Sequence, residues 1–277
     1  MDSQQLSLNF KKLIFWPTLL TSIALQTPAN AAEYAYTSSA NGIASTVARD
    51  YRNFYSKDRL IRLGVAFGLG AIAANSNIDI HIRDWTQEQV ANNTTAPQNP
   101  ETDDSLFAKT FGEFKLMVPV ALLAASLNTI STNTAVGNWG AYTSRAYIVG
   151  LPALWGTQLI TGASRPNETP EGSVWRPFND SNGVSGHAFV GATPFLTIAA
   201  MNPENAWIQY PAYLLSTATG LSRIYDDKHF ASQVALGWYL AWESVDSVMD
   251  ANKRRRRFTV SPMMGIDGYG IIASTRW

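Results

Sequence analysis

The feature that most restricts the fold of this chain is a series of apolar stretches, each interrupted by glycine, proline or small polar residues. Each stretch is about 13 to 20 residues long, a usual length for a helix in a globular protein. Residues 33–59 are expected to be loop or short helix, and the polar segment 75–112 one short helix and a long loop. The sequence therefore predicts an all-α bundle of about six helices. The expected apolar helices cover residues 60–74, 115–127, 141–161, 186–201, 207–221 and 230–248.

These helices could be buried either in protein or in a lipid bilayer. A helix that spans a bilayer needs about 20 consecutive apolar residues, and none of the stretches stays strongly apolar over such a length. The mean hydropathy of the chain, −0.08, is low for a protein with six membrane spans. Charged residues, however, make up only 15% of the chain, against roughly 25% in ordinary soluble domains. We therefore favour helices buried in protein and keep a membrane contact as the alternative.

The N-terminal segment has the pattern of a secretory signal. Lys11 and Lys12 precede an apolar stretch at 13–25, and Ala29-Asn30-Ala31 then provides a small-x-small cleavage site. We expect cleavage after residue 31, which would leave a helical domain at 32–257. The alternative is a short N-terminal anchor that stays attached.

The C-terminal segment differs from the helical region in another way. Residues 258–277 alternate partly between apolar and polar and contain several glycines, which predicts a short β segment with a hairpin around Asp267-Gly268. The basic run 253–257 precedes this segment. It could be the solvated end of the last helix, where cations favour the helix dipole, or a contact with anionic lipid head groups; both interpretations stay open.

The composition excludes several kinds of function. Without cysteine, the chain can form neither a disulfide scaffold, a thiolate metal site nor a cysteine enzyme. Its 21 basic and 21 acidic side chains give a formal net charge of zero, so nothing indicates nucleic acid as a partner. With 46% hydrophobic residues the chain is not intrinsically disordered.

Histidine and arginine residues occur at the ends of the expected helices. Ser185-Gly186-His187 begins one helix, where backbone N–H groups and the helix dipole favour an anion. Arg165 follows another helix, Arg223 lies close to the end of a third, and His229 opens the last. In an antiparallel bundle such ends can meet on one face. The sequence therefore predicts a site with two histidines and two arginines.

This set of side chains suits phosphoryl transfer. Two guanidinium groups can neutralise a phosphate dianion through bidentate hydrogen bonds. One histidine can attack phosphorus while the other protonates the departing oxygen. No metal and no cofactor are needed if arginines and amides stabilise the equatorial oxygens.

Three linked motifs resemble those of the type-2 phosphatidic acid phosphatase superfamily, which also includes bacterial acid phosphatases and vanadium haloperoxidases. The family signature is K-x6-R-P, then P-S-G-H, then S-R-x5-H-x3-D. The chain has Q-LITGAS-R-P at 158–166, V-S-G-H at 184–187 and S-R-IYDDK-H-FAS-Q at 222–233. The order and the internal spacing match, and the similarity runs from about residue 115 to 250. The family core has six helices, which agrees with the expected bundle.

The resemblance implies a role for each matched residue. His229 is similar to the family nucleophile, which forms a phosphohistidine, and His187 is similar to the general acid. The resemblance also implies that phosphate is bound by Arg165, Arg223, Ser185 and Gly186. His81 matches no motif and is expected at the surface.

The chain departs from the family pattern at three positions. Gln158 replaces the first-motif Lys, which removes one positive charge, and Val184 replaces the second-motif Pro. Gln233 replaces the Asp that orients the nucleophile; a glutamine carbonyl can accept the Nδ1 hydrogen bond but gives no charge to the forming cation. Arg176 and Lys228 lie near the motifs and could supply the missing charge. The alternative for both is an ordinary surface charge, which we favour slightly for Lys228.

Two hypotheses follow. The first is an exported, metal-independent phosphatase of the periplasm or cell envelope, possessing no cofactor and acting on a phosphomonoester or pyrophosphate. Its substrate would be a lipid phosphate at a membrane surface or a small soluble phosphate. The second is an envelope protein that keeps the fold with little or no activity, which Gln158 and Gln233 support. The presence of both histidines and both arginines favours the first.

Overall fold

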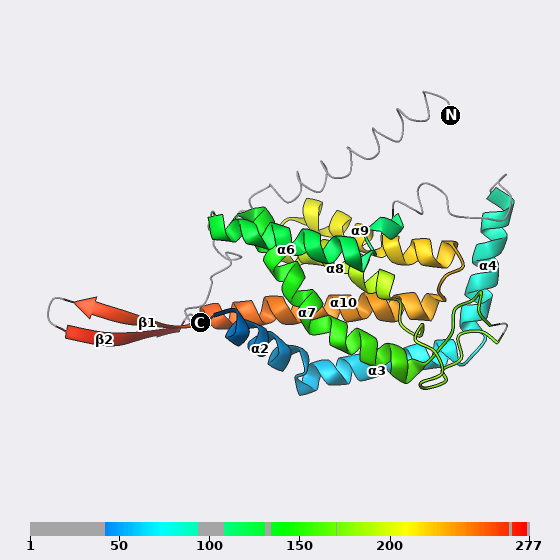
Figure 1. The fold of residues 1–277 in the computed structure, drawn as a ribbon, viewed down its shortest axis with the longest axis horizontal. Coiled ribbons are helices and arrows are strands. Elements are labelled where there is room, and N and C mark those ends of the chain that lie inside the picture. Colours follow the sequence, from blue (N-terminus) through cyan, green and yellow to red (C-terminus); the bar gives the residue numbers. More distant parts are fainter. Residues whose placement is uncertain (1–41, 94–107, 131–133, 170, 266–267, 276–277) are drawn as a thin grey trace, which may run out of the picture.

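The computed structural model describes residues 42–93, 108–130, 134–169, 171–265 and 268–275. The predicted signal at 1–31 lies outside these ranges. The described part contains eight helices of 13 residues or more (Figure 1), which confirms an all-α protein. They are α2 (Gly42–Phe54), α3 (Lys57–Ala74), α4 (Ile78–Asn93), α6 (Phe114–Ile130), α7 (Ala135–Thr161), α8 (Gly186–Met201), α9 (Ala206–Tyr225) and α10 (Ala231–Arg257).

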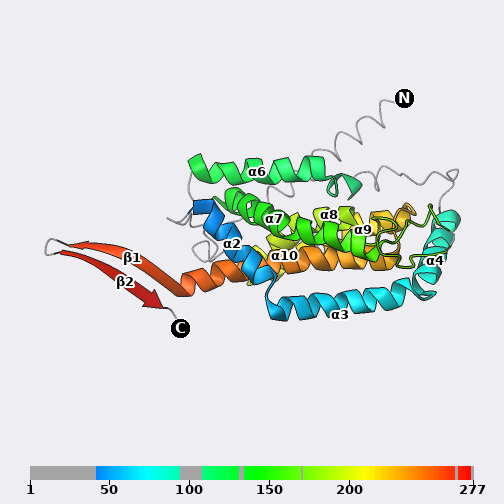
Figure 2. The same cartoon turned by 60° about the horizontal axis from the view of Figure 1, so that its bottom comes forward.

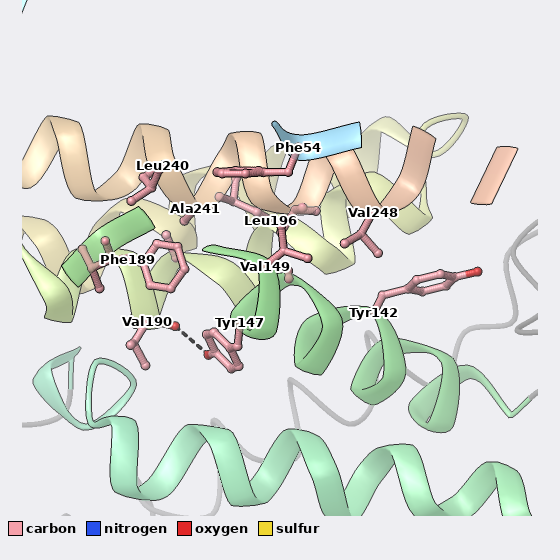
Figure 3. Close-up of a cluster of buried hydrophobic side chains, with 14 of the residues drawn as sticks. Phe54, Tyr142, Tyr147, Val149, Phe189, Val190, Leu196, Leu240, Ala241 and Val248 are labelled. Carbon is pink, nitrogen blue, oxygen red and sulfur yellow. Dashed lines mark hydrogen bonds between the residues drawn. The ribbon is translucent and has the colours of Figure 1, made fainter. Parts of the chain in front are cut away.

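Helix α10 is the central element of the bundle. It packs against α7, α8 and α9 and also against the N-terminal helices α2 and α3 (Figures 1 and 2). Tyr147, Phe189, Leu196 and Leu240 from α7, α8 and α10 meet in the core and are almost fully buried (Figure 3). The buried Tyr147 hydroxyl donates a hydrogen bond to the Val190 carbonyl oxygen at 2.8 Å, as a phenol removed from water requires.

The prediction of about six helices was too low because α2 and α4 lack a long apolar stretch. Helix α2 is held to the bundle partly by a buried ion pair, in which Arg145 of α7 donates two bonds of 2.7 Å to Asp50. In α3, the buried Arg59 guanidinium contacts three carboxylates on one face of α10. These belong to Glu243, Asp246 and Asp250. A contact such as the Asp50–Arg145 pair holds a helix to the bundle without a long apolar stretch in its sequence.

Helix α4 lies across one end of the bundle. The chain bends by 67° between α3 and α4, and α4 then contacts α9 and α10 where α9 ends and α10 begins (Figures 1 and 2). The segment 75–112 was expected to hold one short helix, and α4 is that helix with 16 residues. This bend places α4 beside the predicted site.

The chain ends in a β-hairpin that extends from the end of α10 (Figures 1 and 2). Strands β1 (Phe258–Gly265) and β2 (Gly268–Thr275) are antiparallel, with Phe258 opposite Thr275 and Gly265 opposite Gly268. This agrees with the expected β segment. Residues 266–267, where the turn was predicted, lie outside the described residues.

Within the described ranges, no single helix has both the length and the apolar composition of a membrane span. One bent pair, Lys57–Ala74 with Ile78–Asn92, meets those criteria together. Several helices nevertheless expose large apolar side chains. Examples are Leu69 of α3, Leu123 of α6 and Leu214 of α9.

Candidate active site

The N-terminal end of α8 is fixed by its own cap and by α10. Ser185 is the N-cap, as predicted, and its hydroxyl oxygen accepts a hydrogen bond from the Ala188 amide at 3.3 Å. The Ser185 amide itself donates to the Gln233 carbonyl oxygen of α10 at 2.9 Å. A Cβ atom at Gly237 would lie only 2.3 Å from the Ser185 carbonyl oxygen, so the glycine permits this close approach. The second and third motifs are therefore in direct contact.

The side chain of Gln233 connects the third motif to the first. Its Oε1 atom lies 2.8 Å from Nδ1 of His229 and accepts a hydrogen bond from the Phe230 amide at 3.2 Å. Its Nε2 atom donates to the Ser164 carbonyl oxygen at 2.8 Å. Ser164 directly precedes Arg165. The structure thus brings Gln233 to the ring of His229, where the sequence placed it.

These contacts determine which ring nitrogen of His229 carries the proton. The Phe230 amide can only donate and the Ser164 carbonyl can only accept, so the orientation of the Gln233 amide is fixed. Its Oε1 atom then faces Nδ1 of His229, which must donate the hydrogen of the neutral ring. The lone pair is left on Nε2. A neutral His229 therefore has its free lone pair on Nε2, the nitrogen that is not bonded to Gln233.

His229 is 5% exposed, and its pKa is lowered to about 4. Burial is the main cause, because it disfavours the cation. The hydrogen bond to Gln233 acts in the opposite direction, while the charges of Arg165, His187 and Arg223 lower the pKa further. Side chains from all three motifs thus lie close enough to act on one ring, which stays neutral over most of the pH range.

His187 has a different partner. Its Nε2 atom lies 3.4 Å from Oε1 of Glu113, and both side chains are partly exposed. The pKa of His187 is lowered by burial and by the charge of Arg223, against the opposing effect of Glu113. A Cβ atom at Gly112 would lie 2.9 Å from the His187 Cβ, so this segment packs directly on the histidine. Sequence analysis missed Glu113, because it precedes the expected helix at 115–127 and belongs to no motif.

The two arginines differ in their freedom to bind an anion. Arg165 donates from Nε to the Asn182 side-chain oxygen at 3.0 Å, and its terminal nitrogens have no hydrogen-bond partner within the described part of the chain. Arg223 is 3% exposed and forms an ion pair with Asp226. A phosphate would therefore bind Arg165 directly but would compete with Asp226 for Arg223.

The remaining predicted residues fall into two groups. Gln158 donates from Nε2 to the Val184 carbonyl oxygen at 2.8 Å, which places it beside the N-terminal end of α8. Arg176 instead pairs with Glu171 in an exposed position and is not among the charges that act on either site histidine. His81 is exposed on α4, as expected. Across the described ranges, no group of three or more acidic or histidine side chains could hold a metal ion.

The fold and the site define an all-α protein that gathers histidines, arginines and a helix N-terminus at one end of its bundle. Residues 120–256 match the sequence profile of the PAP2 superfamily. The chain therefore contains a PAP2 superfamily domain, which confirms the resemblance, and membership suggests phosphatase-type activity. Comparisons with curated proteins and with solved structures gave no match. Helices α2, α3 and α4 precede the matched range.

Proposed function

We propose that this protein is an exported, metal-independent phosphatase that hydrolyses a phosphomonoester or a pyrophosphate through a phosphohistidine. The observation that carries the proposal is the neutral, oriented ring of His229, with Nδ1 held by Gln233 and with Arg165 and Arg223 among the charges that act on it. A buried neutral imidazole beside two guanidinium groups is suited to attack a bound phosphate.

In the first step, the Nε2 lone pair of His229 attacks phosphorus. The N–P bond forms while the bond from phosphorus to the leaving oxygen breaks, and protonated His187 gives its proton to that oxygen. The resulting phosphoimidazolium keeps its Nδ1 hydrogen bond to Gln233. In the second step, neutral His187 takes a proton from water, the water oxygen attacks phosphorus and the N–P bond breaks. Phosphate and neutral His229 are regenerated.

The phosphate oxygens would be held by Arg165, Arg223 and the first turn of α8. The Ser185 amide already donates to α10, and the Ala188 amide donates to the Ser185 hydroxyl. The amides of Gly186 and His187 are then the ones that can face an anion at the helix N-terminus. The Ser185 hydroxyl keeps its own hydrogen to donate. Ser185 would thus contribute through its side chain, and Gly186 through its backbone.

The substrate is either a lipid phosphate or a small soluble phosphate. Helices α3, α6 and α9 each expose several large apolar side chains, and this supports the lipid alternative. They also support a peripheral membrane contact. Export to the periplasm or envelope rests on the signal pattern at 1–31, and a mature N-terminus at Ala32, found by mass measurement, would support it.

The competing proposal is an envelope protein with the PAP2 fold and little or no activity, which the neutral Gln158 and Gln233 favour. The deciding experiment is a phosphate-release screen over lipid phosphates, alkyl and aryl phosphates and pyrophosphate. It uses the purified protein, with and without vanadate, and His229→Ala as control. Vanadate-sensitive release that His229→Ala lacks supports the phosphatase. No release above His229→Ala on any substrate supports the inactive alternative.

A further inference from the structure

Three polar residues at helical spacing on α4 reach the turn that carries His229. Asp79, Arg83 and Gln87 stand at positions i, i+4 and i+8, so they share one face of the helix. Each contacts a different part of the connection from α9 to α10. Helix α4 precedes the matched range 120–256, so these contacts come from outside the PAP2 domain.

Asp79 acts as an N-cap for α10 from another helix. Helix α10 begins at Ala231, so its N-cap residue is Phe230, whose side chain cannot accept a hydrogen bond. The Asp79 carboxylate supplies the missing acceptor: Oδ1 accepts from the Ser232 amide at 2.9 Å and Oδ2 from the Ser232 hydroxyl. Oδ2 also accepts from the Ser173 hydroxyl in the loop that carries Arg165. With Asp79 only 1% exposed, all these bonds are shielded from water.

Arg83 and Gln87 fix the other side of the turn. Arg83 makes two bonds of 2.7 and 2.8 Å to the carboxylate of Asp227. Asp227 has a φ of 53°, a left-handed conformation that is uncommon outside glycine, although Asp adopts it more readily than most residues. Gln87 donates to the carbonyl oxygens of Ile224 and Tyr225 at the end of α9, at 3.2 and 3.3 Å.

We propose that α4 positions the nucleophile, with Asp79 and Arg83 as the positioning residues for His229. Within the described residues, neither side chain forms a hydrogen bond with the ring of His229. Both act through the ends of the turn in which His229 lies. Arg83 keeps Asp227 in its left-handed conformation, and Asp79 holds the first turn of α10, which contains Gln233. The catalytic part of the inference rests on the proposed phosphatase function.

The test compares two arginine–carboxylate pairs of similar geometry in the full-length protein. Arg83→Gln removes the pair with Asp227. Arg62→Gln is the matched control, because Arg62 of α3 also makes two bonds, of 2.7 and 2.9 Å, to one carboxylate, that of Glu243. We expect Arg83→Gln to lower kcat for an aryl phosphate by about 10- to 100-fold with little change in KM, as for a misplaced reacting group. Arg62→Gln should change kcat by less than about twofold if its pair is purely structural.

Two further measurements separate positioning from a general loss of stability. The variants are compared at equal folded fraction, from circular dichroism and Tm. The double variant Arg83→Gln/Asp227→Asn should lose no more kcat than Arg83→Gln alone, because the pair acts as one unit. Equal kcat losses in Arg83→Gln and Arg62→Gln, or a loss seen only in KM, would overturn the inference.

A measurement that does not depend on catalysis can test the positioning role separately from the proposed phosphatase function. NMR of the histidine ring nitrogens reports whether His229 keeps its proton on Nδ1. In Asp79→Asn and Arg83→Gln we expect a mixture of tautomers, and in Arg62→Gln the wild-type signal. If wild type releases no phosphate but these spectra differ as expected, the phosphatase proposal fails and the positioning role stands. Unchanged spectra in Asp79→Asn and Arg83→Gln refute the positioning role, whatever the activity.

Discussion

The two histidines of the site lie in contrasting surroundings, although they lie close together. His229 is buried and its ring bonds to a neutral amide that is itself held by two backbone groups. His187 is partly exposed and faces the carboxylate of Glu113. A neutral partner fixes the tautomer and stabilises the cation only through its hydrogen bond, whereas a carboxylate also favours the protonated ring through its charge. The two surroundings therefore suit different tasks in the proposed mechanism, with His229 neutral for attack and His187 helped by Glu113 to carry a proton.

The largest expected effect comes from removing the buried histidine. His229→Ala should lower kcat by at least about 10³-fold, because it removes the proposed nucleophile that forms the covalent intermediate. The phosphoenzyme trapped by rapid acid quench should disappear with it. His81→Ala is the matched control, since His81 is exposed on α4 and outside the site. A phosphoenzyme trapped in His229→Ala would show that another side chain is the nucleophile, and the different tasks proposed for the two histidines would then be wrong.

Removing the partly exposed His187 should instead have an effect that depends on the substrate. General acid catalysis is typically worth about 10²–10⁴-fold, and His187→Ala should lose that much on an alkyl phosphate, whose leaving oxygen must be protonated. On a nitrophenyl phosphate, whose leaving group needs little protonation, the loss should be far smaller. Steady-state kcat/KM on both substrates measures this. Equal losses of kcat/KM on the two substrates would contradict the proposed role of His187 as the general acid.

The pH dependence of kcat/KM should report both histidines in the free enzyme. His229 attacks only when neutral, and its pKa is about 4, so the rate should fall as the pH drops through about 4. His187 must be protonated, and its pKa is lowered from 6.5, so the rate should fall again as the pH rises, beginning below 6.5. The profile should thus be a bell with an acidic optimum. A rate that increases up to neutral pH would contradict this assignment.

The sequence could predict much of the site because its three motifs are local. Ser185 was expected as a helix cap. Gln233 is the third residue of α10, from which a side chain reaches back to the residues just before the helix, and His229 is one of these. Gln158 was predicted only as an auxiliary residue, and it lies beside α8. The Ser185 cap and the His229–Gln233 contact depend on neighbours that are close in the chain, whereas Gln158 reaches Val184 across 26 residues.

The parts that were missed depend on tertiary contacts. Glu113 reaches His187 from a segment far away in sequence, and nothing in its local pattern identifies a partner. Asp79 and Arg83 form a polar face on α4, but the sequence does not say that the chain bends by 67° and lays that face on the α9–α10 turn. Arg176 is the opposite case: it is close to the motifs in sequence, but its side chain pairs with Glu171 instead of lying near the histidines.

The smallest effects should come from exchanging the partners of the two histidines, a neutral amide for His229 and a carboxylate for His187. Gln233→Glu has the same length as the native side chain and gives His229 a carboxylate, which should raise its pKa and move the acidic limb of kcat/KM upward by about one unit or more. It also removes the donor to the Ser164 carbonyl, so kcat should fall even where the ring is neutral.

Glu113→Gln does the reverse for His187, because it replaces a carboxylate by a neutral amide. It should move the basic limb to lower pH by less, because Glu113 is 45% exposed and its charge is screened. The two variants should therefore shift opposite limbs in opposite directions. If Gln233→Glu moved the basic limb, or if Glu113→Gln moved the acidic one, the two histidines would have exchanged tasks.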